Sequence, residues 1–307
     1  MGKSVKSKLG IPPDISRYGY LVGTAGFEFL EWVGLFYPQK STMAERLDIY
    51  QAYFSFLEVS CYLDDPQREG FAELARSFTG KIECSVRVPK SIASPKVWNS
   101  AIGGKLLDQM IGAVYPLVEA GRLYSLVFPV DEKTIRSEKR LEYLIDIAER
   151  ANKVRIDVHI EFRHRSWHKL WVLETLKAHN IGICNLELPM DSAFPLKYYA
   201  TSEKGYVKYC GRNRKAWNAV ERRRGSKEEC FDYDYSTTDM SAMVDGQFEL
   251  GKKVGTAAVV FGNVVGALAV GNAVQCMLLL NHRIEMGKML KRTSNRDVLG
   301  AKSVKIT

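Results

Sequence analysis

A cluster of ionisable side chains ends a strand-like run in the middle of the chain. In "IDVHIEFRHRSW" (156–167), apolar residues alternate up to Ile160, and Glu161, Arg163 and His164 follow at once. Glu161 and Arg163 are two positions apart, so on a strand both side chains point to one face. The arginine would keep the carboxylate ionised, and a histidine can act as a general acid or base near neutral pH. The stretch therefore predicts a site for an anion or a polar ligand.

Strand-like and helix-like runs alternate around this stretch. The expected strands are 18–24, 56–62, 81–89, 122–130, 154–162, 181–188, 204–210 and 255–263. The expected helices are 41–55, with Ser41 or Thr42 as N-cap, 65–78, 99–120, 137–151, 166–180, 237–253 and 265–287. Eight strands, most of them separated by helices, predict an α/β fold, a (β/α)₈ TIM-like barrel of parallel strands surrounded by helices. An open doubly wound sheet is the alternative.

The positive charge of the chain lies mainly at its two ends. Residues 1–17 carry four Lys/Arg and one Asp, residues 287–307 carry six Lys/Arg and one Asp, and the whole chain carries +9, which leaves +1 for residues 18–286. We therefore expect a basic flexible arm (1–17), a single barrel domain (18–286) and a basic C-terminal tail (287–307). Basic tails can hold nucleic acid weakly through its phosphates, although solubilising ends have the same composition.

Three further features bound the class of protein. The six cysteines are scattered and form no C-x-x-C pair, and no N-terminal signal is evident, so we expect a cytoplasmic protein. The stretch 254–281 has no charged residue and is long enough to span a membrane. Its β-prone start and internal glycines instead favour a buried strand, turn and helix, so no membrane contact is expected.

Six segments in order resemble the DUF72 (YecE-like) family. They are "VGTAGF" (22–27) with Trp32 and "FYP" (36–38), "FSFLEVSCY" (54–62), "SVRVPKSI" (85–92), "EFRHRSW" (161–167), "YVKYCGR" (206–212) and "FGNVVGALAVGNA" (261–273). The resemblance covers about residues 20 to 280. It implies a TIM-like barrel with a pocket, and it implies no particular reaction.

The chain departs from the family pattern at several polar positions. Ser60, Pro129 and Cys210 stand where the family commonly has Asn, Gln and His. Lys208 and Glu187 stand where it commonly has Arg and Asp. If the family pocket is catalytic, these changes predict an altered or lost activity.

In a TIM-like barrel, side chains at the C-terminal ends of the strands converge on one mouth. On this basis the candidates for proton transfer are Glu161, His164 and Glu58, and the candidates for ligand binding are Thr24, Arg87, Arg163, Glu187, Lys208 and Asn263. Structural roles remain open for several of them. Glu161 and Arg163 could close the barrel end as an ion pair, His164 could cap the next helix, Glu58 could be a buried partner of Arg87, and Asn263 could order the last loop.

The segment 210–229 is the most basic part of the barrel domain and follows the seventh strand. Arg212, Arg214 and Lys215 are candidates for contact with a phosphate or a nucleic-acid backbone, and a solvated loop is the alternative. The five histidines do not have the spacing of a three-histidine site, so we expect neither a metal nor a cofactor.

Three functions follow from these features. The first is a barrel with a polar, anion-accepting pocket at its mouth for a small ligand, in a hydrolase-like enzyme. The second is a nucleic-acid-associated protein that uses the basic tails and the 210–224 loop. The third is a non-catalytic barrel that binds a partner.

Overall fold

A computed structural model gives a closed barrel of eight parallel strands, in which each strand pairs with its neighbours in the sequence and β8 returns to β1. The structure describes residues 10–60, 68–189, 196–222 and 224–301. The predicted (β/α)₈ barrel is confirmed, and the open sheet is excluded because β1 and β8 pair along five residues. Residues 1–9 of the expected arm and 302–307 of the expected tail lie outside the described residues.

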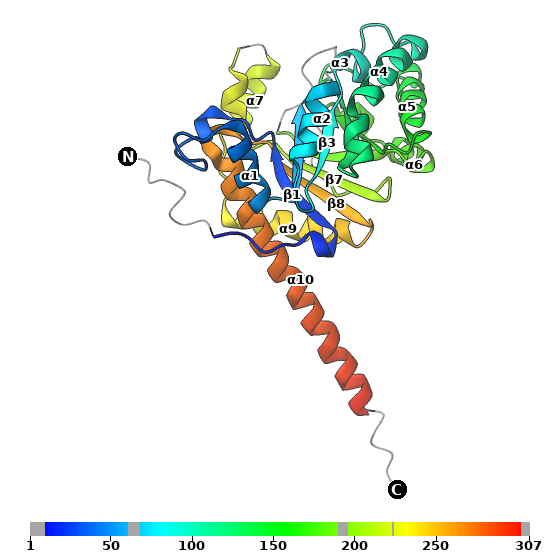
Figure 1. Ribbon diagram of the computed structural model, residues 1–307. Helices are drawn as coiled ribbons and strands as arrows, with labels where there is room; N and C mark the ends of the chain where they lie inside the picture. The colour runs from blue at the N-terminus through cyan, green and yellow to red at the C-terminus, as the bar shows by residue number, and fades with distance from the viewer. Residues whose placement is uncertain (1–9, 61–67, 190–195, 223, 302–307) are drawn as a thin grey trace.

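The strands and helices alternate around the barrel (Figure 1). The strands are β1 (Tyr20–Ala25), β2 (Phe56–Ser60), β3 (Glu83–Arg87), β4 (Leu123–Val130), β5 (Val158–Phe162), β6 (Gly182–Glu187), β7 (Lys204–Tyr209) and β8 (Thr256–Phe261). The α-helices are α1 (Met43–Tyr53), α2 (Arg68–Ser77), α3 (Lys90–Ala93), α4 (Ser100–Glu119), α5 (Glu138–Asn152), α6 (Leu170–Ala178), α7 (Arg214–Glu221), α8 (Lys227–Cys230), α9 (Thr237–Gly251) and α10 (Leu268–Ala301). Short 3₁₀ helices η2 (Ser16–Tyr18), η3 (Leu30–Trp32), η4 (Arg165–Trp167) and η5 (Val265–Ala267) join some of them.

The predicted start of the first helix is confirmed. Thr42 caps α1, because its side chain accepts from the backbone of Glu45 while the Glu45 side chain accepts from the backbone of Thr42. One turn before the end of α1, the Tyr50 hydroxyl donates to the carbonyl of Phe56 and accepts from the backbone of Thr24. This bridge needs glycine at position 23, since a Cβ there would lie 1.8 Å from the carbonyl oxygen of Phe56.

The helix expected over 166–180 is interrupted. Residues 165–167 form η4, and α6 begins only at Leu170, because His168 has non-helical backbone angles. Trp167 is fully buried, stacks on Phe162 at 4.6 Å and donates its indole N–H to the carbonyl of Thr134. Burial of this large ring fixes the entry to α6, which the helical pattern of the segment did not reveal.

The apolar stretch near the C-terminus forms β8, a turn and α10, as predicted. Gly266 and Ala267 have positive φ angles of 57° and 61°, and the chain turns there before α10 begins. Within the described residues, Val265–Met289 is the one helical segment long and apolar enough to cross a membrane, and half of its apolar window is buried inside the protein. The helix is longer than expected, because it continues to Ala301 and projects away from the barrel (Figure 1).

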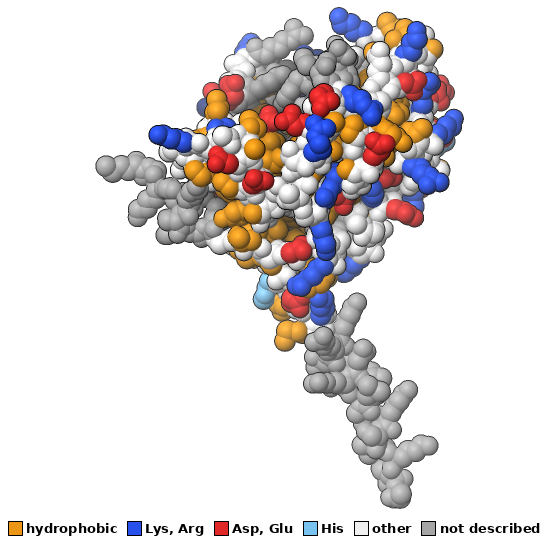
Figure 2. Space-filling model, viewed as in Figure 1, with side chains coloured by type: hydrophobic (Ala, Val, Ile, Leu, Met, Phe, Trp, Pro, Cys, Tyr) orange, Lys and Arg blue, Asp and Glu red, His pale blue; other side chains and the backbone are white. Residues whose placement is uncertain are grey.

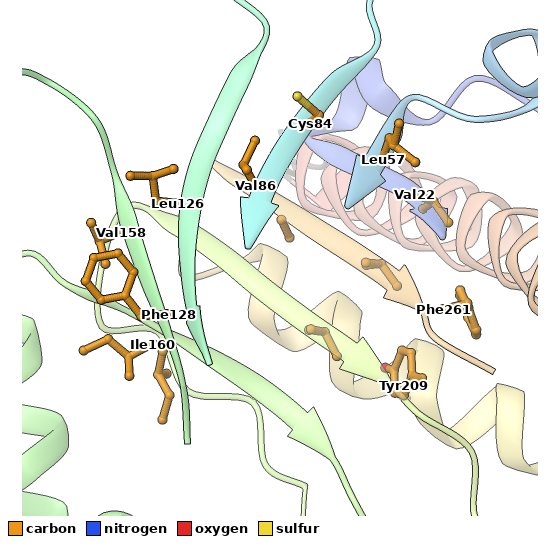
Figure 3. Packing of buried hydrophobic residues seen from close by; sticks show 14 of the residues in the cluster. Val22, Leu57, Cys84, Val86, Leu126, Phe128, Val158, Ile160, Tyr209 and Phe261 are labelled. Atoms are coloured by element: carbon orange, nitrogen blue, oxygen red, sulfur yellow. The ribbon is translucent and has the colours of Figure 1, made fainter. Parts of the chain in front are cut away.

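Alternate strand residues point to two different surroundings. The outward set packs between the barrel and its helices and is apolar; Figure 3 shows Val22, Leu57, Val86, Ile160 and Phe261 among it. The inward set mixes apolar residues at one level with charged residues at another. Because successive side chains of a strand point to opposite faces, the position of a candidate residue in this alternation decides whether it faces the barrel interior.

Candidate functional site

The barrel interior holds a compact cluster of charges from four strands. Glu58 of β2 and Glu161 of β5 are both fully buried. The ammonium of Lys208, on β7, lies 2.5 Å from a carboxylate oxygen of Glu58 and 3.6 Å from one of Glu161. Lys208 therefore joins two carboxylates that are far apart in the sequence.

Two arginines complete this cluster, which we call the mouth cluster (Glu58, Arg87, Glu161, Arg163 and Lys208). Arg87 of β3 donates from both terminal nitrogens to Glu161, and one of these nitrogens lies 3.6 Å from Glu58. Arg163 donates to Glu161 at 2.8 Å, which confirms that the two share a face. Its other terminal nitrogen lies 3.8 Å from Glu132. Glu161 thus accepts from two guanidinium groups.

The electrostatics of the mouth cluster keep Glu161 and Lys208 ionised. Burial alone would raise the pKa of Glu161, but the positive charges of Arg87, Lys208 and Arg163 outweigh it and hold the pKa well below the usual value. For Lys208, burial and Arg87 lower the pKa, yet Glu58 and Glu161 raise it above its ordinary value. Glu161 therefore stays a carboxylate and Lys208 stays an ammonium near neutral pH.

The carboxylates and the cations differ in their access to solvent. The side chains of Glu58 and Glu161 have no exposed surface, whereas 13% of Arg87, 26% of Arg163 and 8% of Lys208 is exposed. All the solvent-facing surface of the mouth cluster therefore belongs to the three cations. With two carboxylates and three cations, the cluster carries a formal charge of +1.

Two residues that the sequence reasoning missed extend the mouth cluster inward. The Tyr206 hydroxyl lies 2.7 Å from Glu58, to which it donates, and 2.8 Å from the hydroxyl of Ser85. Tyr206 and Ser85 each precede a predicted site residue, Lys208 and Arg87, by two positions. The strand period of two would have placed them on the same face.

His164 lies beside the mouth cluster as the N-cap of η4. Its Nδ1 accepts from the backbone N–H of Ser166 at 3.2 Å and lies 2.8 Å from the Ser166 hydroxyl. This is the capping role that the sequence left open for His164. Another histidine, His159 of β5, is fully buried deeper in the barrel, where Nε2 donates to the carbonyl of Lys204.

Thr24 and Asn263 are not brought into the mouth cluster. The Thr24 hydroxyl contacts Tyr50 of α1 at 3.0 Å, on the helix-facing side of β1. The Asn263 amide donates to the carbonyl of Tyr233 and to Asn272, each at 2.7 Å, and so ties β8 to the segment before α9. The expectation that these two side chains join the same site is therefore wrong. Thr24 lies at an outward position of β1, and Asn263 lies beyond the end of β8.

Glu187 belongs to a separate polar cluster. It accepts from Arg212 at 2.7 Å and from the hydroxyl of Tyr235, and Arg212 also pairs with Asp239. Glu187 follows Leu186 of the inward set by one position, so it points away from the mouth cluster. Arg212 is therefore engaged by two carboxylates rather than presented to a phosphate.

The other basic candidates lie on a helix and not on the expected loop. Arg214 and Lys215 open α7 and are exposed. The α7 and α8 segments pack against each other, so most of 210–229 is ordered by its own helices. Among the described residues, no group of three or more His, Cys, Asp or Glu side chains is arranged to hold a metal ion.

Comparison with known proteins gives a family and a fold. The model of the family "Protein of unknown function DUF72" matches residues 21–295. A crystal structure of a DUF72 family protein from Thermotoga maritima MSB8 is similar, with 25% identity, a TM-score of 0.75 and coverage of 85% of this chain and 99% of that chain. One from Enterococcus faecalis V583 has 20% identity, a TM-score of 0.74 and coverage of 85% and 95%. No curated protein matches the sequence. The chain belongs to the DUF72 family.

Proposed function

We propose that the chain binds a small anionic ligand at the C-terminal mouth of the barrel. The observation that carries this proposal is the layering of the mouth cluster: the carboxylates are wholly buried, and the solvent meets only Arg87, Arg163 and Lys208. An anion that approaches from the mouth meets the donors of these cations, with the partly exposed carboxylate of Glu132 to one side, 3.8 Å from Arg163. Charge-assisted hydrogen bonds to an oxyanion are among the strongest in proteins.

In this proposal Glu161 positions the arginines. Its two oxygens accept from Arg87 and Arg163, so the guanidinium planes are fixed before a ligand arrives. Preorganised donors lose less side-chain entropy on binding than mobile ones. Arg163 is the most exposed cation and would make the main ligand contact, with Lys208 as a second donor.

A hydrolase-like activity would also need a group that moves a proton. Glu161 is a poor choice because three cations keep its pKa low. Glu58 accepts from the Tyr206 hydroxyl and from Lys208, so it is connected to two groups that carry protons. His164 is the other candidate, next to the cluster on the chain. Binding is the part of the proposal that the geometry supports most directly.

The test is a thermal-shift screen with inorganic phosphate, sulfate, di- and tricarboxylates, nucleotides and sugar phosphates. We expect one anion class to raise the melting temperature of the native chain, and this rise to be lost in Arg163→Ala and partly kept in Arg163→Lys. The matched control is Arg76→Ala, which removes an equally charged side chain from an exposed pair with Glu69 on α2.

Two results would contradict the proposal. One is an equal loss of response in Arg76→Ala, which would mean that overall charge matters and not the mouth cluster. The other is a flat response of the native chain over the whole panel at ligand concentrations up to the millimolar range. Circular dichroism of each variant separates loss of binding from loss of folding.

A further inference from the structure

The end of the barrel opposite the mouth collects basic side chains. The turn before a parallel strand lies at the N-terminal end of the barrel, and most of these turns contain a Lys or Arg. The residues are Arg17 before β1, Lys81 before β3, Arg122 before β4, Lys153 and Arg155 before β5, Lys177 before β6, and Lys252 and Lys253 before β8. All but Arg122 are exposed. We call this set the basic face.

Most of these cations are not neutralised by a carboxylate. Within the described part of the chain, Lys81, Lys153, Arg155, Lys177 and Lys253 form no ion pair. Two carboxylates of neighbouring turns are engaged: Asp157 pairs with Lys204 at 2.8 Å, and Glu249 pairs with Lys252 at 2.5 Å. Arg122 donates to the backbone carbonyls of Gly80 and Ile82, and these uncharged acceptors do not neutralise its positive charge. Asp14, Glu119 and Glu203 are exposed carboxylates that remain among them.

Both basic ends of the sequence start from this same end of the barrel. The Tyr18 hydroxyl donates to Glu285 of α10 at 2.7 Å, and the ammonium of Lys288 lies 3.9 Å from the centre of the Tyr18 ring. The segment before β1 is thereby fixed to the middle of α10, at Glu285 and Lys288 (Figure 1). The charges of +3 in 1–17 and +5 in 287–307 are thus attached at one place, although they lie some 270 residues apart.

A hollow opens within the basic face. It has a volume of about 500 Å³ and lies between the end of α6, the segment before β7 and the end of α9. Lys177 and Lys253 lie on its wall, together with Tyr198, Tyr199 and Glu203. The volume is in the range of small-ligand sites. The visible surface in Figure 2 also carries a column of Lys and Arg side chains that runs toward the base of α10.

We propose that the basic face binds single-stranded nucleic acid, with one nucleotide in the hollow between Lys177 and Lys253 and the phosphate backbone on the surrounding cations. Proteins that bind single strands without sequence preference combine basic tracks with aromatic side chains on which bases stack. Lys177, Lys253 and Tyr199 provide both parts in one place. A lipid bilayer is the other large polyanion, but its flat surface does not enter a concave hollow. This site is independent of the anion site at the mouth.

The test measures fluorescence anisotropy of labelled single-stranded RNA and DNA, ~12 nucleotides long to match the usual site size, at several salt concentrations. We expect binding that weakens as salt rises. Each phosphate contact contributes ~0.7 to the slope of log K against log salt. The double variant Lys177→Ala/Lys253→Ala should therefore lower the slope by roughly 1.4, a loss of about 25-fold in affinity at 0.1 M salt.

The matched control is Lys105→Ala/Lys139→Ala, which removes the same charge from exposed positions on α4 and α5. It should keep nearly native affinity. Arg163→Ala, at the mouth, should also bind nucleic acid normally, whatever its response to small anions. Tyr199→Ala should weaken binding more than Tyr199→Phe, which keeps the ring.

Three outcomes overturn the inference. They are no binding even at low salt, an equal loss in the α4/α5 control, and binding to phosphatidylserine vesicles without binding to either oligonucleotide. The first shows that the basic face holds no nucleic acid, the second that only total charge matters, and the third that the partner is a membrane surface.

Discussion

Replacing Glu161 with glutamine tests whether the mouth cluster is an electrostatic unit. Glutamine keeps the size of the side chain but removes the charge that holds Arg87 and Arg163. The formal charge of the cluster rises from +1 to +2, and Arg87, which is nearly buried, loses its main partner. Breaking a buried pair by removing one charge costs about 3–5 kcal/mol in free energy of unfolding. We expect Glu161→Gln to lie in this range.

Urea unfolding at neutral pH, followed by circular dichroism, measures this cost. Sulfate should restore more stability to Glu161→Gln than to the native chain, because an anion can replace the lost carboxylate. The double variant Glu161→Gln/Arg87→Met returns the cluster to +1 and should recover part of the loss, as a double-mutant cycle would show. A cost below about 1 kcal/mol, typical of exposed pairs, would refute the reasoning that the cluster is desolvated.

Three further predictions concern stability. Burial lowers the pKa of His159 to about 4. The stability that the neutral imidazole gives is therefore complete above the unfolded pKa near 6.5 and is lost as pH falls toward 4, at about 1.4 kcal/mol per pH unit. Urea titrations should show that the free energy of unfolding of His159→Gln depends less on pH in this range, and an unchanged dependence would contradict this. Thr42→Ala should cost about 1 kcal/mol through loss of the α1 cap, with Thr42→Ser close to native in thermal unfolding. Gly23→Ala should cost about 3 kcal/mol or more, because its Cβ would meet the carbonyl oxygen of Phe56 at 1.8 Å; Gly70→Ala, in open space on α2, is the matched control and should unfold at or above the native temperature.

The barrel itself could be predicted because each unit is locally consistent. Apolar strand runs recur eight times, helices lie between most of them, and the closed topology is the arrangement that buries all these strands. The boundaries were less accurate where tertiary packing decides them. The start of β5 moved from residue 154 to Val158 because the chain turns first, with Arg155 at a φ of 60°.

The candidate site could be predicted in part. Four residues, Glu58, Arg87, Glu161 and Lys208, come together because they lie on inward strand positions. Arg163 follows the end of β5 by one residue and keeps the same parity. Thr24 and Glu187 were assigned to the mouth by their place at a strand end, without regard to parity, and both point elsewhere.

Two kinds of contact could not be read from local patterns. The pairing of Arg212 with Glu187 and Asp239 joins three separate segments, and only the folded chain brings them together. The hollow before β7 depends in the same way on the ends of α6 and α9, which are distant in the sequence. Composition located the charge of the two ends, but not the contact of Tyr18 with α10.

The contact of Tyr18 with Glu285 and Lys288 has a consequence for re-engineering the chain. Because the segment entering β1 is held against α10, a short peptide could join α10 to this segment without crossing the barrel. The order of the units could then be rotated, with new ends opened in an exposed connection such as 79–81, between α2 and β3. Domains whose ends lie close together commonly tolerate such circular permutation. In each rotated form the joined segments would stay beside Tyr18, while the new ends would lie at another point on the same barrel.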